Sequence, residues 1–173
     1  MTDQLIRAWY VLHTRSRFEN VVNEGLIKKT HEVFLPKILV RSKRRDRKAM
    51  IRVPLFPGYL FVRTDLNPYE HLDILKTVGA VRLIGSMEGP VSVADDKIDS
   101  LRIMVGTDQP VATGQRFKSG DHVAVVNGPF AGVTGIFVRY KGSGRVIVNI
   151  DALGQSAGVD VDQDDVEILP EIS

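Results

Sequence analysis

The spacing of hydrophobic residues near the start of the chain changes from a period of two to a period of about 3.6. Residues 8–14 form a β-rich run in which Trp9, Val11 and His13 share one face. In residues 17–29 apolar side chains recur at helical spacing, which predicts an amphipathic helix. Its predicted apolar residues are Phe18, Val21, Val22, Leu26 and Ile27. The pattern therefore predicts a strand followed directly by a helix.

Further strand signals follow this helix. We expect a short strand at 33–35, a hairpin with arms 37–40 and 49–55, strands at 58–63 and 80–84, and a loop at 85–90. With the helices described next, the order is β-α-β-β-β-α-β-α. This order indicates an α+β fold, with a mainly antiparallel sheet flanked by helices.

Two more helices are marked by capping residues. Asn67 is suited to cap a helix that begins at Pro68 and ends at Gly79. Its predicted apolar face carries Leu72, Leu75 and Val78. A third helix is expected after Asp95 or Asp96, with an apolar face of Ile98, Leu101 and Met104.

The remainder of the chain predicts a second domain. Residues 106–115 are polar, contain Gly and Pro, and show no periodicity, which is typical of a linker. Short strands are expected at 122–126, 133–140, 145–150, 157–161 and 166–169. Such closely spaced strands favour a small β-barrel. We therefore expect an N-terminal domain at 1–105, a linker at 106–115 and a barrel at 116–173.

The most informative segment is 55–62, which reads Leu-Phe-Pro-Gly-Tyr-Leu-Phe-Val. Its composition is that of a strand, but a central strand should avoid both Pro and Gly, so we expect a bent or edge strand. If helices cover one face of the sheet, Leu60 is buried there and Tyr59 and Phe61 point to the other face. Together with Phe56, these rings form either a second core or an exposed surface that binds another protein.

Charge is unevenly distributed along the 173 residues, whose net charge is +2. Residues 1–110 hold 18 Lys+Arg and 13 Asp+Glu, which gives +5, and residues 111–173 hold 5 and 8, which gives −3. The run 41–48 contains six basic residues and one acid. At the tip of a hairpin it is either a solvated loop or a contact for nucleic-acid phosphates.

No pattern in the sequence predicts an enzyme, a metal site or a cofactor. The four histidines are scattered, there is no cysteine, and neither a nucleophile elbow nor a phosphate-binding loop is present. The series Asp160, Asp162 and Asp164 resembles the start of a calcium loop, but Asp165 stands where that loop needs glycine. The first residues do not form a signal peptide and no apolar run is long enough to span a bilayer. We expect a cytoplasmic protein with no membrane partner.

Two regions of the chain resemble, in the same order, the two domains of one protein family. The run from Trp9 to Leu12, the helix after it, and residues 56–62 resemble the N-terminal domain of NusG-type transcription elongation and antitermination factors. Residues 120–135, which include Gly-Pro-Phe, resemble their KOW domain, an SH3-like barrel. The amino-acid sequence of residues 55–62 resembles that of specialised RfaH-like paralogs more closely, and these paralogs serve particular operons. For the C-terminal domain we expect a barrel rather than a helical form.

The resemblance implies partners and residues for this chain. It implies binding to the clamp helices of the RNA polymerase largest subunit, suppression of pausing or termination, and contact with upstream or non-template DNA. The implied polymerase-binding residues are Trp9, His13, Phe56, Pro57, Tyr59 and Phe61. The implied nucleic-acid-binding residues are Arg15, Lys28, Lys29, Arg41, Lys43, Arg44, Arg45, Arg47, Lys48 and Lys76. The KOW domain would bind a partner such as ribosomal protein S10 or Rho through Phe130, Ile150 and Leu153.

An alternative from another class remains open. KOW barrels also occur in ribosomal proteins, so the chain could be an RNA- or ribosome-binding module that acts in translation. The basic run at 41–48 would suit RNA as well as DNA.

Overall fold

The chain folds into two units. The computed structural model describes residues 6–43, 49–140 and 142–170. Residue contacts divide the chain into Met1–Ala94 and Asp95–Ser173. The division falls before the third helix, whereas the sequence predicted a first domain at 1–105 followed by a linker at 106–115. The difference arises because this helix packs against strands of the second unit.

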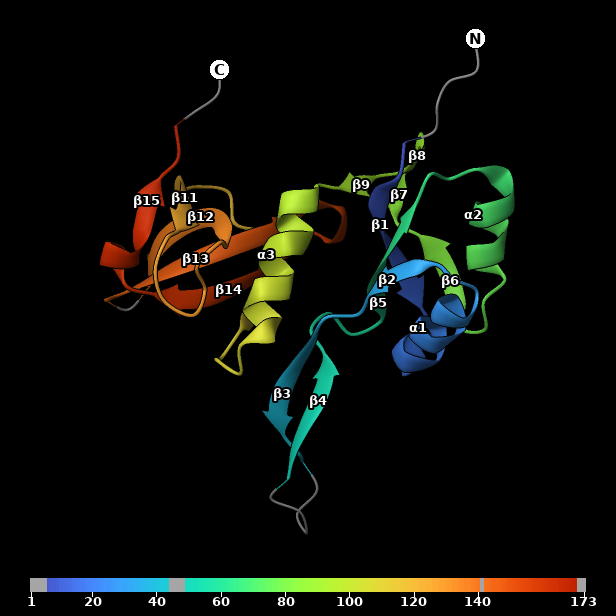
Figure 1. Cartoon of the computed structure of the whole chain (residues 1–173), viewed down its shortest axis with the longest axis horizontal. Coiled ribbons are helices and arrows are strands. Elements are labelled where there is room, and N and C mark those ends of the chain that lie inside the picture. The colour runs from blue at the N-terminus through green and yellow to red at the C-terminus, as the bar shows by residue number, and fades with distance from the viewer. Residues whose placement is uncertain (1–5, 44–48, 141, 171–173) are drawn as a thin grey trace. The chain divides into compact units, whose positions relative to one another are not determined.

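Five antiparallel strands form the main sheet of the first unit (Figure 1). They are β1 (Ala8–Thr14), β2 (Glu32–Phe34), β5 (Tyr59–Thr64), β6 (Ala80–Leu83) and β9 (Ser92–Val93). The order is β2-β5-β1-β6, and β9 also pairs with β1. The central pair, β1 with β5, runs in register from Ala8 opposite Thr64 to His13 opposite Tyr59. The predicted antiparallel sheet is confirmed.

Two helices, α1 (Glu19–Lys28) and α2 (Pro68–Leu75), pack against one face of this sheet. The core between them consists of Tyr10, Leu12, Val22, Leu26, Leu60, Val62, Ile74 and Leu83. The start of α2 is as predicted, because the Asn67 side-chain oxygen accepts the backbone N–H of Glu70 at 2.9 Å and Pro68 is the first helical residue. Leu60 and Val62 face the helices, so the predicted orientation of β5 is confirmed.

The apolar faces of the two helices were predicted only in part. Val22 and Leu26 of α1 are buried as expected, whereas Val21 and Ile27 are exposed. In α2 the residue that enters the core is Ile74, whereas Leu72 is 52% exposed. Val78 lies beyond the end of α2 and is also exposed, so Leu72 and Val78 were wrongly placed in the core.

The predicted hairpin is present as a separate two-stranded sheet, β3 (Lys37–Arg41) with β4 (Met50–Pro54). In Figure 1 this ribbon extends away from the main sheet of its unit. The segment predicted as a loop at 85–90 is instead a second small hairpin, β7 (Gly85–Ser86) with β8 (Gly89–Pro90). Its strands are only two residues long, which is too short for a periodic pattern in the sequence.

The second unit holds a six-stranded antiparallel sheet with the order β10-β14-β13-β12-β11-β15. Its strands are β10 (Ala112–Gln115), β11 (Asp121–Val125), β12 (Thr134–Tyr140), β13 (Ser143–Ile150), β14 (Gln155–Val161) and β15 (Val166–Ile168). Two 3-10 turns, η1 (Asp151–Leu153) and η2 (Gln163–Asp165), join the later strands. All five predicted barrel strands are confirmed. β10 was missed, because it lies in the segment predicted as a linker and all four of its residues are exposed.

Helix α3 (Asp95–Gly106) belongs to the second unit. Its apolar face is the predicted one, since Ile98, Leu101 and Met104 are fully buried. The Ser100 hydroxyl accepts the backbone N–H of Thr134 at 3.0 Å, which ties the helix to the start of β12. A polar residue within the buried face of α3 is thus satisfied by the barrel.

Candidate macromolecular interfaces

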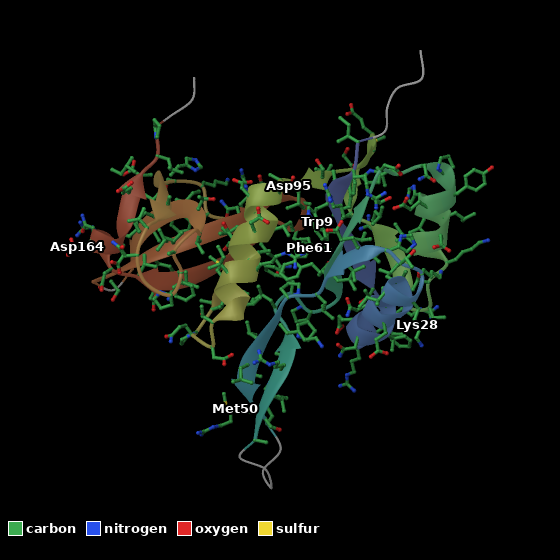
Figure 2. All side chains as sticks on the ribbon, in the orientation of Figure 1. Trp9, Lys28, Met50, Phe61, Asp95 and Asp164 are labelled. Carbon is green, nitrogen blue, oxygen red and sulfur yellow. The ribbon has the colours of Figure 1, made fainter. Side chains whose placement is uncertain are left out.

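The sheet face that α1 and α2 leave uncovered carries the predicted aromatic residues. Strand register arranges its side chains in three cross-strand rows. The rows are Glu32–Arg63–Trp9–Val93, then Phe34–Phe61–Val11, then Tyr59–His13–Arg82. Trp9 and Phe61 lie close together in Figure 2. Residues from the two halves of the first unit thus meet on one surface.

The Pro57-Gly58 pair forms a tight turn and not a bend within a strand. The backbone N–H of Tyr59 donates to the Phe56 carbonyl at 3.1 Å, and Gly58 has a φ of +87°. These are the features of a type II turn, in which proline and then glycine occupy the central positions. The predicted bent strand is therefore wrong, because β5 begins only at Tyr59.

This turn is fixed to the end of β1. The Gly58 carbonyl accepts the backbone N–H of Thr14 at 2.8 Å, and His13 Nδ1 lies 3.1 Å from the same oxygen. The His13 and Tyr59 rings are 5.0 Å apart between centroids. The turn and the ring pair therefore form one rigid corner of the sheet.

Burial separates the predicted polymerase-binding residues into two groups. Phe56 and Phe61 are only 1% and 0% exposed, and Trp9 is buried too, so of the two alternatives left open by the sequence these rings take the core position in this structure. Phe61 stacks on Phe34 at 5.9 Å and meets Phe56 edge-on at 6.4 Å. Phe34 was not singled out from the sequence. Phe34, Phe56 and Phe61 therefore form a packed aromatic layer.

Pro57, His13 and Tyr59 remain accessible at the corner. Pro57 is exposed and the two rings are half-buried. Arg82 was missed by sequence reasoning, although it pairs directly with His13 across β1 and β6 and is exposed. Only the strand register reveals this neighbour, because Arg82 and His13 are far apart in the sequence.

Four of the predicted cations lie next to α1 or α2. Lys29 donates to the Asp73 carbonyl at 2.9 Å and to the Thr77 hydroxyl at 3.2 Å, so it links the two helices. Lys28 and Lys76 are exposed next to this link, and Lys28 marks the end of α1 in Figure 2. Arg15 is exposed as well, and its backbone N–H donates to the Gly79 carbonyl at 2.8 Å. Lys29 therefore has a structural contact, whereas the other three present their charge to solvent.

The hairpin carries the remaining predicted cations. Arg41 and Lys43 are exposed, and Arg44, Arg45, Arg47 and Lys48 lie outside the described residues. Cross-strand pairing places Lys37, Leu39, Arg41, Met50 and Arg52 on one face. The opposite face holds Ile38, Val40, Ile51 and Val53. The ribbon thus has one cationic face and one β-branched face.

A charged network that the sequence did not reveal joins residues beside β1 and α1 to α2. His31 Nε2 lies 2.6 Å from Asp73 Oδ2, and Arg7 pairs with Glu70 at 3.1 Å. The hydrogen bond from His31, followed by the charge of Lys29, holds the pKa of the Asp73 carboxyl below its usual value. These residues surround an open hollow of about 600 Å³ with charges of both signs. The network thus links the residues that follow α1 to α2.

In the second unit, the predicted partner-binding residues are mostly internal. Ile150 is fully buried because it continues the inward series Val146 and Val148 of β13. Phe130 is also buried, and only Leu153 in η1 is partly exposed. In this structure Leu153 is therefore the predicted residue that a partner could reach directly, whereas Ile150 and Phe130 lie in the interior.

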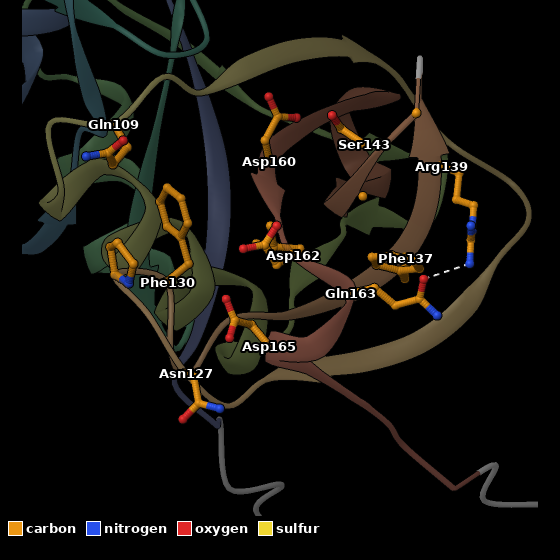
Figure 3. A pocket seen from close by; sticks show the side chains of 14 residues that line it. Gln109, Asn127, Phe130, Phe137, Arg139, Ser143, Asp160, Asp162, Gln163 and Asp165 are labelled. Carbon is orange, nitrogen blue, oxygen red and sulfur yellow. Dashed lines mark hydrogen bonds between the residues drawn. The ribbon is translucent and has the colours of Figure 1, made fainter.

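The second unit also contains a cavity of about 450 Å³ (Figure 3). Phe130 and Phe137 line its wall, and Asp160, Asp162 and Asp165 lie around it. Asp160 pairs with Arg145 at 2.9 Å, and a dashed line marks the 2.7 Å bond from Arg139 to Gln163. Across the described ranges, no three His, Cys, Asp or Glu side chains converge as metal ligands.

Charge differs between the two structural units even more than between the predicted domains. Met1–Ala94 holds 16 Lys+Arg and 9 Asp+Glu, which gives +7. Asp95–Ser173 holds 7 and 12, which gives −5. The cationic surfaces therefore belong to the first unit. Among the helices of the described residues, none is long and apolar enough to cross a bilayer.

Comparison with known proteins identifies the family. Residues 7–102 match the family model described as "Transcription termination factor nusG", which covers the entire main sheet and most of α3. The chain belongs to the NusG family. Membership explains the order of motifs in both units and makes the chain a transcription factor of the termination and antitermination class.

Relatives and a solved structure extend the similarity to nearly the whole chain. The transcription termination/antitermination protein NusG of Thermus thermophilus is 28% identical over 89% of this chain and 94% of its own length. The Pseudomonas aeruginosa protein of the same name is 28% identical over 94% and 99%. A structure described as "Domain interaction in Thermotoga maritima NusG" aligns with a TM-score of 0.54 at 24% identity, over 95% of this chain and 98% of its own. That alignment supports the α+β and barrel architecture.

Proposed function

We propose that this protein binds RNA polymerase through the corner formed by Pro57, Tyr59 and His13, and thereby reduces pausing or termination. The observation that carries the proposal is the fixed turn, which holds two half-buried rings 5.0 Å apart beside an exposed proline. Rigid aromatic side chains lose little conformational entropy on binding and often dominate the affinity of an interface.

The chemistry of the corner suits a helical partner. Half-exposed rings above a packed aromatic layer offer shallow apolar contacts of the kind that receive the apolar face of a helix. The clamp helices of the polymerase largest subunit are the occupant that family membership suggests. Phe56, Phe61 and Trp9 contribute by supporting the corner, because they are themselves buried.

Contact with nucleic acid is proposed for the cationic surfaces of the same unit. Lys28 and Lys76 are exposed at the ends of α1 and α2, Arg15 is exposed just before α1, and Arg41 and Lys43 are exposed at the hairpin. Their contacts with upstream or non-template DNA phosphates would add affinity without reading sequence. Lys29 is left out of this set because it is engaged with Asp73 and Thr77.

For the second unit we propose recruitment of a protein partner, such as ribosomal protein S10 or Rho, with Leu153 as its accessible apolar residue. The unit's net charge of −5 would repel RNA phosphates. This charge disfavours the alternative of an RNA-binding barrel in translation. A specialised, operon-specific role is a narrower form of the proposal, and a gene position at the head of a long biosynthetic operon would support it.

Polymerase binding can be tested with one variant and a matched control. We expect Tyr59→Ala to weaken binding of the full chain to bacterial core RNA polymerase by about 30-fold, as for a typical hot-spot residue. Tyr69→Ala is the control, because Tyr69 is 89% exposed on α2, away from the uncovered face of the sheet. Equal affinities of the two variants, measured by fluorescence anisotropy, would refute the proposal. Comparing co-sedimentation with ribosomes and with polymerase separates it from the translation alternative.

A further inference from the structure

Arg82 extends the proposed polymerase-binding corner onto a third strand. It lies opposite His13 on β6, and His13 lies opposite Tyr59 on β5, so the three side chains form one cross-strand row. The neighbouring Leu83 faces the helices and is buried in the core. Arg82 must therefore point to the same face as His13, since successive strand residues alternate.

The guanidinium of Arg82 is available to a partner. Arg82 is exposed, and within the described part of the chain its side chain has no hydrogen bond or ion pair. Arg63, which lies at the opposite side of the same face, is different because Glu32 pairs with it at 3.3 Å. Arg82 is thus an unpaired cation next to half-buried rings.

A partner that covers Tyr59 and His13 would also remove water from around Arg82. A desolvated cation is unfavourable unless a negative group pairs with it, and the planar guanidinium fits a carboxylate with two parallel hydrogen bonds. Such a pair at the edge of an apolar contact fixes orientation and rejects partners that carry a positive charge there.

We propose that Arg82 pairs with an acidic side chain of the polymerase segment that covers Tyr59 and His13. This inference rests on the proposed function and adds a requirement for its partner, namely a carboxylate beside the apolar stripe. A protein carboxylate is favoured over a nucleic-acid phosphate because Arg82 shares its row with two rings. The phosphate-binding candidates Lys28 and Lys76 lie instead at the ends of the helices that pack against the other face.

The test measures affinity of full-length variants for core RNA polymerase in the absence of nucleic acid. We expect Arg82→Glu to weaken binding by at least about tenfold, Arg82→Ala by a few-fold, and Arg82→Lys least of all. Raising the salt concentration should weaken the parent more than Arg82→Ala, because the variant lacks the screened pair. Lys118→Glu is the matched control, since it makes the same charge change at an exposed residue of the second unit.

The outcomes separate this inference from the function on which it rests. If Tyr59→Ala loses binding but Arg82→Glu binds as the parent does, the proposed pair between Arg82 and a carboxylate is refuted. The proposed polymerase-binding site is then still supported. Unchanged binding in Tyr59→Ala overturns both. An Arg82→Glu effect that appears only when a DNA–RNA scaffold is present assigns Arg82 to nucleic acid and also overturns the inference. Equal thermal midpoints of the Arg82 variants confirm that folding is unaffected.

Discussion

His31 Nε2 lies 2.6 Å from the Asp73 Oδ2 atom, although the two residues are 42 positions apart in the sequence. His31 follows α1 and its side chain is only 7% exposed, whereas Asp73 belongs to α2. The contact therefore links the two helices that cover one face of the sheet. Lys29 strengthens the link, with its ammonium 3.4 Å from the same carboxylate.

This pair makes stability depend on acid pH. The pKa of Asp73 is lowered in the folded state, chiefly by the hydrogen bond from His31. A lowered folded pKa means that the contribution is present above the unfolded aspartate pKa of about 4 and disappears as pH falls through the folded value. We expect Asp73→Asn to lower the urea midpoint at pH 6, and the difference from the parent to shrink below about pH 4.

A matched variant tests the assignment of this acid dependence. Glu24→Gln removes an exposed carboxylate from α1, for which the structure shows no partner within the described residues. Its urea midpoint should equal that of the parent at every pH. If Glu24→Gln and Asp73→Asn gave the same pH profile, the acid dependence would not come from the pair with His31.

The orientation of α2 gives a second prediction. Ile74 is fully buried between the helix and the sheet, whereas Leu72 is 52% exposed. Ile74→Ala should reduce the free energy of unfolding by about 2–5 kcal/mol, because it removes buried methyl groups and leaves a cavity. Leu72→Ala should change it by no more than about 0.5 kcal/mol, as surface substitutions usually do. Urea unfolding of both variants checks the difference, and the reverse ranking would mean that α2 presents its other face to the sheet.

Local patterns were enough to predict much of the first unit. Asn67 and Pro68 mark a helix start by their own chemistry, and the alternation in residues 8–14 sets which side chains share a face. The rotation of α2 was not predictable, because Leu72, Ile74 and Leu75 are all apolar and only packing decides which of them is buried.

The sequence indicated which residues belong to the candidate site, but not which of them are buried and which are exposed. Strand alternation correctly predicted that Phe61 and Leu60 point to opposite faces of the sheet. Nothing local indicated that Phe34 would stack on Phe61 and that both would be buried. Arg82 and His31 depend on contacts between distant segments. Such contacts leave no periodic or spacing signal in a single sequence.

The turn at Gly58 provides a third prediction, which links backbone conformation to binding. Its φ of +87° is strained for any residue with a Cβ, at a cost of about 1–2 kcal/mol. Gly58→Ala should therefore lower stability and also weaken polymerase binding, because the turn positions Tyr59 against His13. Gly106→Ala is the control, since a Cβ there meets nothing within 4 Å. The measurements are the thermal midpoint and the Kd for core polymerase, and a Gly58→Ala protein with parental values for both would show that the turn tolerates a side chain.

Substitutions of the lysines at the helix ends provide a fourth prediction, because some should affect only DNA binding and one should affect stability. Lys28 and Lys76 are exposed, so Lys28→Gln and Lys76→Gln should each weaken DNA binding and reduce the slope of log K against log salt by about 1, with no change in the unfolding midpoint. Lys29→Gln should instead lower the midpoint, because it removes the contacts with Asp73 and Thr77 that join α1 to α2. DNA titrations at several salt concentrations, together with urea unfolding, distinguish the two effects. A Lys29→Gln protein of parental stability but reduced salt slope would assign Lys29 to DNA after all.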